Sequence, residues 1–230
     1  MKKLSAMLGW CLALVLANAG DEALRPVTDP RPVLQELQRK MSSLRSSYLE
    51  FKQERHLKLF SEPLKSEGVM LIERPDSIRW ETTAPYQSIL LSAHKSVAQF
   101  ERDESGWKKL NLAFPQLLRR VMEQIGLMQQ GKLEALTADF TISVATGTNV
   151  ALMTLVPKDQ NTRATMSSLE VRMLPDFSAT REVVMHEPGG DFTRIIFGHE
   201  RRNVAFPAGT FDQTRPLDIA AVRAVVNNRP

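Results

Sequence analysis

Residues 71–80 read Leu-Ile-Glu-Arg-Pro-Asp-Ser-Ile-Arg-Trp, and they decide the fold because an Arg74-Pro75 step joins two apolar segments. Proline has no N–H for a strand ladder, so this step predicts the end of a strand. The residues on either side alternate, which predicts one strand over 66–73 and another over 77–82. The connection is too short for a crossover helix, so these strands should be antiparallel.

The same period of two continues upstream and downstream of this stretch. Leu49, Phe51, Leu57 and Leu59 alternate with charged residues, which predicts one long strand over 46–59 with one face in water. Further strands are expected near 87–92, 96–101, 107–110, 140–144, 149–156, 169–173, 179–187 and 192–199. The sequence therefore predicts about eleven strands in one antiparallel sheet.

Helical spacing appears in two longer segments. In the first, over 33–45, residues such as Leu37 and Met41 share one face, and Asp29 can cap its start. In the second, over 114–130, Leu118, Met122 and Ile125 belong to a broad apolar stripe. A short terminal helix is expected over 218–226.

A long antiparallel sheet with two amphipathic helices favours a mainly β (α+β) fold. The sheet would be strongly curved into an incomplete barrel, with a helical lid over its concave face. This arrangement leaves an apolar cleft between sheet and helices. The residues expected to line the cleft are Leu37, Met41, Phe51, Met70, Ile72, Trp80, Ile89, Leu91, Leu118, Met122 and Ile125.

The N-terminus has the pattern of a secretory leader. A cationic start precedes a short apolar run, and Ala17-Asn18-Ala19 resembles a cleavage site, so residues 1–19 are expected to be a signal peptide. Residues 20–32 should form a flexible arm, and 33–230 a single domain. Cys11 is the only cysteine and lies within the leader, so a mature chain would have neither disulfides nor thiolate metal ligands.

The composition argues against several functional classes. The formal net charge is +4, and two of those charges, Lys2 and Lys3, lie in the leader, so a nucleic-acid partner is not expected. There is no G-x-S-x-G elbow, phosphate-binding glycine loop or H-E-x-x-H motif, and the four histidines lack ligand spacing. The sequence predicts neither catalytic residues nor a cofactor or metal. The methionines fit either ordinary core filling or an adaptable pocket.

Three elements, in this order and spacing, resemble the LolA family of periplasmic lipoprotein carriers. They are Phe51-Lys52-Gln53 at a strand end, the Arg74-Pro75 step before a strand containing Trp80, and Leu155-Val156-Pro157-Lys158. The resemblance implies that Arg74 locks a helical lid through backbone carbonyls. Ile78 replaces an aromatic residue that helps the family's carriers engage the releasing transporter. Ala93 and His94 stand where the family usually has Asp-Gly.

The resemblance implies a monomeric periplasmic carrier that takes a lipidated protein from an inner-membrane transporter to an outer-membrane acceptor. A glycolipid or pigment lipid is an alternative cargo. A second alternative is a lipid-sensing domain of an envelope-stress pathway. An exported hydrolase is disfavoured because no nucleophile constellation is present.

Overall fold

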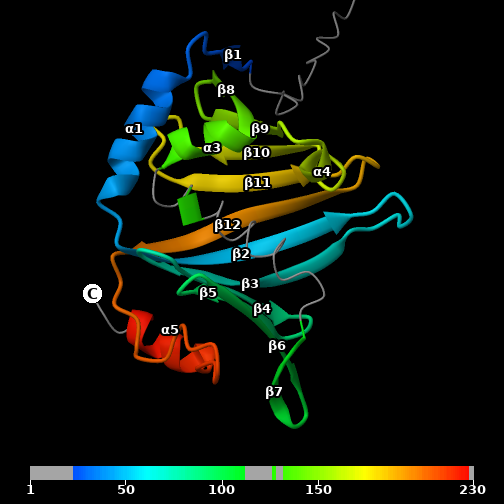
Figure 1. The fold of residues 1–230 in the computed structure, drawn as a ribbon, viewed down its shortest axis with the longest axis vertical. Coiled ribbons are helices and arrows are strands. Elements are labelled where there is room, and N and C mark those ends of the chain that lie inside the picture. The colour runs from blue at the N-terminus through cyan, green and yellow to red at the C-terminus, as the bar shows by residue number, and fades with distance from the viewer. Residues whose placement is uncertain (1–22, 112–125, 128–131, 228–230) are drawn as a thin grey trace, which may run out of the picture.

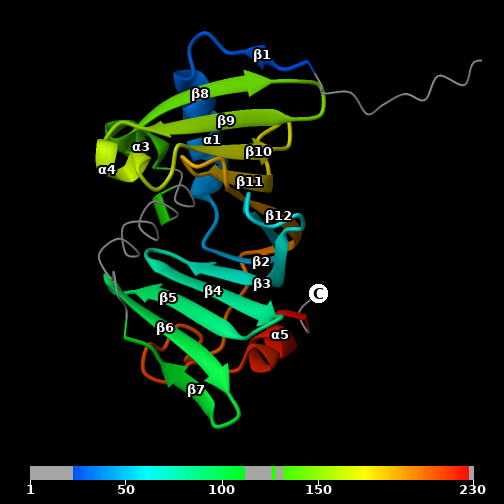
Figure 2. The ribbon, with the colours of Figure 1, turned by 90° about the vertical axis from the view of Figure 1, so that its right-hand side faces the viewer.

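The computed structural model describes residues 23–111, 126–127 and 132–227, and its strands form one antiparallel sheet of twelve (Figures 1 and 2). The sheet is curved and unclosed, which confirms the predicted incomplete barrel. Its order is β1-β8-β9-β10-β11-β12-β2-β3-β4-β5-β6-β7. The strands are β1 (Arg25–Pro26), β2 (Ser46–His56), β3 (Leu64–Glu73), β4 (Ser77–Ala84), β5 (Ser88–Ala93), β6 (Ser96–Asp103), β7 (Gly106–Lys109), β8 (Phe140–Thr146), β9 (Ala151–Pro157), β10 (Ser168–Met173), β11 (Thr180–His186) and β12 (Phe192–Arg202).

The twelfth strand, which the sequence does not predict, is β1. Arg25 and Pro26 pair with Thr146 and Ala145 of β8, so this part of the expected flexible arm is attached to the sheet. A two-residue strand that contains proline has no readable alternation. The expected signal peptide lies outside the described residues.

The described helices are α1 (Arg31–Ser42), α3 (Leu133–Asp139), α4 (Gln160–Arg163) and α5 (Ile219–Asn227). The N-cap residue of α1 is Pro30, one residue after the expected Asp29, and no side chain caps the helix there. The Asp29 carboxylate instead accepts the backbone N–H of Arg31, the first helical residue, at 3.0 Å. The expected terminal helix is present as α5, whereas α3 and α4 were not predicted. The helix expected over 114–130 lies outside the described residues apart from Gly126 and Leu127, which are helical.

One face of the sheet, called here the inner face, is covered by α1 over strands β8 to β11. Leu34 and Leu37 of α1 pack against Met153, Leu155 and Val171 in one buried cluster. The same face continues into the middle of the sheet, because Val183 of β11 is opposite Ile195 of β12, and Ile195 is opposite Gln53 of β2. The sequence correctly predicts that α1 buries its apolar stripe against the sheet.

The opposite face, called here the outer face, is covered by the C-terminal segment over strands β2 to β6. Val222 and Val226 of α5 pack on Tyr48, Val69 and Leu71. Further along the same face, Phe211 packs against a cluster of Ile89, Leu91, Ala98 and Phe100. The central strands are therefore buried on both faces.

A buried ion pair fastens this C-terminal segment to the outer face. Arg79 is fully buried, and its Nη2 lies 2.6 Å from the Glu81 carboxylate. Its other bonds are to backbone: Nη1 donates to the carbonyl of Thr210 at 2.9 Å, and Nη2 donates to that of Leu217 at 2.6 Å. One guanidinium thus joins β4 to two points of the segment that precedes α5.

Gly68 of β3 is a position where a larger residue has no room. A Cβ atom there would lie 1.9 Å from the carbonyl oxygen of Glu81 and 2.9 Å from Cζ of Phe51. We expect Gly68→Ala to lower the free energy of unfolding by about 1–3 kcal/mol or more, because the backbone at Glu81 must move to make room for the added atom. Gly189→Ala is the control, since nothing lies within 4 Å of the added atom. Equal urea midpoints for the two variants would contradict this prediction.

The hairpin between β2 and β3 departs from the predicted pattern at its tip. The strand ends at His56 instead of continuing to 59, because the chain turns and the Phe60 N–H donates to the Leu57 carbonyl at 2.9 Å. Leu59, expected on the buried side of a strand, is 85% exposed. The alternation of apolar residues thus extends beyond the strand into the turn.

Candidate functional site

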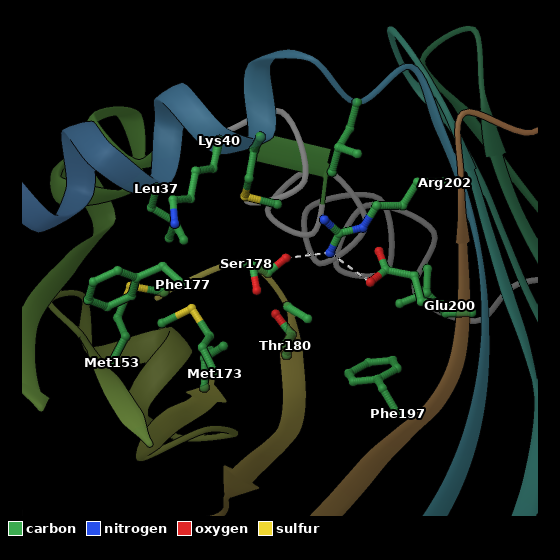
Figure 3. A pocket seen from close by; sticks show the side chains of 15 residues that line it. Leu37, Lys40, Met153, Met173, Phe177, Ser178, Thr180, Phe197, Glu200 and Arg202 are labelled. Atoms are coloured by element: carbon green, nitrogen blue, oxygen red, sulfur yellow. Dashed lines mark hydrogen bonds and ion pairs between the residues drawn. The ribbon is translucent and has the colours of Figure 1, made fainter. Parts of the chain in front are cut away.

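An apolar cavity lies between α1 and the inner face of β9 to β12 (Figure 3). Its floor comes from the sheet and includes Met153, Val171, Met173 and Phe197. Phe177, in the turn between β10 and β11, also lines it. The lining is completed by Leu37, Lys40, Met41, Leu44, Leu49, Ser178, Ala179, Thr180, Glu200 and Arg202.

The cavity is narrow. A water-sized sphere can occupy only about 60 Å³ of it, which is space for a few water molecules. Methionine side chains occupy much of the wall, and they are unbranched and able to adopt new rotamers. An elongated apolar ligand could enter only if α1 moved away from the sheet.

Charged side chains gather where the cavity meets β12. Arg202 Nη2 lies 2.7 Å from the Glu200 carboxylate and also donates to the backbone carbonyl of Ser178, in the turn before β11 (Figure 3). On α1, Lys40 donates to the carbonyl of Asp176. The cavity is therefore apolar inside and polar at its edge.

Arg74 binds the C-terminal end of α1. Its Nη2 donates to the carbonyl of Met41 at 2.6 Å, and its Nη1 donates to the carbonyl of Ser42 at 3.3 Å. The Met41 carbonyl also accepts the Leu44 N–H at 3.1 Å, so Arg74 adds a second donor to it. The carbonyls at the end of a helix carry the negative end of its dipole, which favours a cation there. Burial lowers the pKa of the Arg74 guanidinium. The resemblance implies bonds from Arg74 to backbone carbonyls of a helix, and the lid-locking role itself stays a prediction.

Six of the predicted cleft residues lie on the inner face, in two adjoining groups. Leu37 and Met41 line the cavity itself. Phe51, Met70, Ile72 and Trp80 belong to a neighbouring cluster, in which the rings of Phe51 and Trp80 are 4.7 Å apart. Leu49 and Phe197 belong to both groups and join them. The structure thus brings six of the predicted residues onto one continuous apolar surface.

Two of the predicted cleft residues lie on the wrong face. Ile89 and Leu91 are opposite Glu81 and Arg79 of β4, and they are buried under Phe211 on the outer face. Leu90, between them, is opposite Trp80 and packs on the inner face. Leu118, Met122 and Ile125 lie outside the described residues.

Ile78, predicted to contact a transporter, is buried on the inner face. It is 2% exposed and lies opposite Ile72 of β3, in the same cluster as Trp80. A partner could touch it only after this cluster opened.

Several lining residues were not among the predicted cleft residues. Met153, Val171, Met173 and Phe197 lie on strands whose alternation is readable, but the sequence does not say which alternate set faces the cavity. Phe177 lies in a turn and has a positive φ of 59°, which no periodic pattern indicates. The methionines on these strands, Met153 and Met173, were the sequence feature that could have indicated the cavity wall.

Two further kinds of feature bear on function in the described residues, namely metal-ligand clusters and membrane-spanning helices. Within 23–111, 126–127 and 132–227, no group of three or more His, Cys, Asp or Glu side chains could hold a metal ion. None of the helices in those residues has the length and hydropathy needed to cross a membrane.

A family model described as outer membrane lipoprotein carrier protein LolA matches residues 42–214. The outer-membrane lipoprotein carrier protein of Pseudomonas paraeruginosa is 25% identical over 154 residues, which are 66% of this chain and 70% of that protein. A solved LolA superfamily protein from Nitrosomonas europaea aligns with a TM-score of 0.42 at 8% identity, over 82% of this chain and 99% of that one. The complex of MucA and MucB from Pseudomonas aeruginosa aligns with a TM-score of 0.46 at 11% identity, over 80% of this chain and 61% of that one. The family match covers most of the chain, from the end of α1 to the segment on the outer face, and the protein belongs to the LolA family of outer membrane lipoprotein carriers.

Proposed function

We propose that the protein is a periplasmic carrier that holds the acyl chains of a lipidated protein in the inner-face cavity. It would receive this cargo from an inner-membrane transporter and deliver it to an acceptor at the outer membrane. The observation that supports the proposal most directly is the bond from Arg74 to the end of α1, beside a narrow apolar cavity.

The geometry supports a cycle of opening and closing. In the closed state α1 lies on the sheet, and Arg74 donates to two carbonyls at the end of the helix. Cargo entry would displace α1 and break those bonds, while acyl chains would cover the apolar wall that α1 leaves. The bonds to Arg74 re-form only when the cavity empties, so they favour release.

The cavity wall suits acyl chains better than a rigid ligand. Met41, Met153 and Met173 can repack around chains of different length, and the aromatic rings of Phe177 and Phe197 add apolar area. The charged edge formed by Arg202 and Glu200 would meet the polar part of the cargo. The proposed activity is binding and transfer, without a chemical step.

Mass spectrometry of ligands retained after native purification from the periplasm tests this function. We expect the wild-type protein to retain molecules with long acyl chains, and their masses would distinguish lipoprotein from glycolipid or pigment lipid. Met41→Gln places a polar group on the cavity wall and should reduce retention severalfold. Met185→Gln is the matched control, because Met185 is also half-buried but does not line the cavity.

Two outcomes would count against the carrier. Equal retention by the two variants would remove the cavity from the proposal. A protein that retains lipid but never transfers it to outer-membrane vesicles would instead support the lipid-sensing alternative.

A further inference from the structure

One end of the sheet carries a group of exposed apolar side chains. Leu59 is 85% exposed, Phe60 52%, Leu64 54% and Tyr86 60%. We call these four residues the apolar rim. Val156, the fifth large hydrophobic side chain that is exposed in the described part of the chain, lies at the end of β9. Single exposed apolar residues are ordinary, but a group at one end of a molecule indicates an interaction surface.

The strand register places the rim at one end of the sheet. Arg55 of β2 pairs with Leu64 of β3, and Glu67 of β3 pairs with Ala84 of β4, just before the turn that holds Tyr86. Arg74 lies at the opposite end of β3. The rim is therefore separate from the contact between Arg74 and α1, and the β2–β3 hairpin projects there (Figure 1).

The tip of this hairpin is held in place by its neighbour, the turn between β11 and β12. The Lys58 N–H donates to the Asp191 carboxylate at 2.8 Å. The side chain of Lys58 crosses Gly190, where an added Cβ would lie 2.5 Å from its Cε. Leu59 and Phe60 thus project from a braced turn, so little conformational freedom would be lost when they bind.

The shape and charge of the tip favour one kind of partner. A projecting apex presents two apolar side chains without a groove around them, so a rigid protein surface could bury it only in a matching pocket. A fluid bilayer interface accepts such an apex directly. Lys58 and Lys65 flank the apolar residues, where their long side chains can reach lipid phosphates. Glu62 and Asp191 balance their charge, so the apolar residues carry most of the proposed contact.

We propose that the apolar rim is a membrane-contact surface, with Leu59 and Phe60 entering the headgroup region and Lys58 and Lys65 facing lipid phosphates. This inference goes beyond the carrier function and does not depend on the identity of the cargo. It describes how the protein touches a lipid surface with its cavity closed. Two apolar side chains give weak, reversible adsorption rather than anchoring.

Fluorescence at single labelled positions tests the contact. Cys11 lies in the predicted leader, so Leu59→Cys purified from the periplasm would carry one thiol for an environment-sensitive dye. Vesicles of phosphatidylethanolamine and phosphatidylglycerol should shift the emission of this dye to shorter wavelength. Lys95→Cys, at an exposed turn between β5 and β6, is the control and should show no shift. No shift at either position would overturn the proposal.

Flotation with the same vesicles measures the contribution of each part of the rim. The double variant Leu59→Ser/Phe60→Ser should lose at least about tenfold in partition coefficient, because both apolar side chains leave the interface. Lys58→Gln/Lys65→Gln should lose affinity for anionic vesicles but not for phosphatidylcholine. Partition of the serine variant equal to wild type, or no adsorption of the wild type, would refute the membrane contact. Ligand retention is measured separately, so either result leaves the carrier proposal intact.

Discussion

Arg74→Leu is expected to give a folded protein that accepts cargo but does not release it. The change removes the bonds to the carbonyls of Met41 and Ser42, which together should contribute about 1–3 kcal/mol because the donor is charged. The closed state loses this stabilisation, whereas the open, loaded state does not. Loading from donor membranes followed by addition of acceptor membranes measures the two steps separately.

Two further variants define the role of Arg74. Lysine should restore release only in part, because it lacks the planar fork that reaches two carbonyls at once. Arg45→Leu is the matched control, since Arg45 is an exposed arginine three residues beyond α1. Release by Arg74→Leu at the rate of Arg45→Leu would show that Arg74 does not act in the cycle.

Arg79→Ala is expected to cause the largest loss of stability, about 3–5 kcal/mol, because it leaves the Glu81 carboxylate buried without its cation. It also frees the carbonyls of Thr210 and Leu217, so the C-terminal segment should detach from the outer face. Urea unfolding measures the first effect, and proteolysis within 203–218 measures the second.

The control for Arg79 is another arginine that contacts the same segment. Arg102 lies 3.4 Å from Asp218, but both side chains are well exposed, so Arg102→Ala should change stability by less than about 1 kcal/mol. Arg79→Met/Glu81→Leu should recover much of the loss, since an apolar pair of similar volume needs no charge compensation. A double variant as unstable as Arg79→Ala would contradict the ion-pair explanation.

The sequence predicts most of the strands because a period of two is visible wherever one face of a strand is wet. The strand β5 was predicted over 87–92, but the sequence does not distinguish its two faces, because Ile89, Leu90 and Leu91 are all apolar. The C-terminal segment covers the outer face there, so both faces are dry and the alternation disappears. The assignment of Ile89 and Leu91 to the cleft fails for this reason.

The burial of the outer face also could not be predicted, because polar residues lie on it. Arg79 and Glu81 alternate with Ile78 and Trp80, as the wet side of a strand would, yet both are buried. The segment after Pro207 has no periodicity that would show what it covers. The position of Arg74 at a strand end could be read from the local Arg-Pro step, and its lid-locking role stays a prediction. The lining by Phe177 and Phe197 depends on contacts between distant parts of the chain, which no local pattern shows.

The length of β3 sets the distance between the apolar rim and Arg74. The strand spans Leu64–Glu73, and at about 3.3 Å per residue its ends are roughly 30 Å apart. When the rim rests on a bilayer and β3 points away from it, the Arg74 end of the strand lies that far above the lipid headgroups. Lipid alone cannot reach it there. Cargo that displaces α1 from Arg74 would therefore have to be presented by a protein domain that rises from the membrane to that level, so contact with a bare bilayer would not load the carrier.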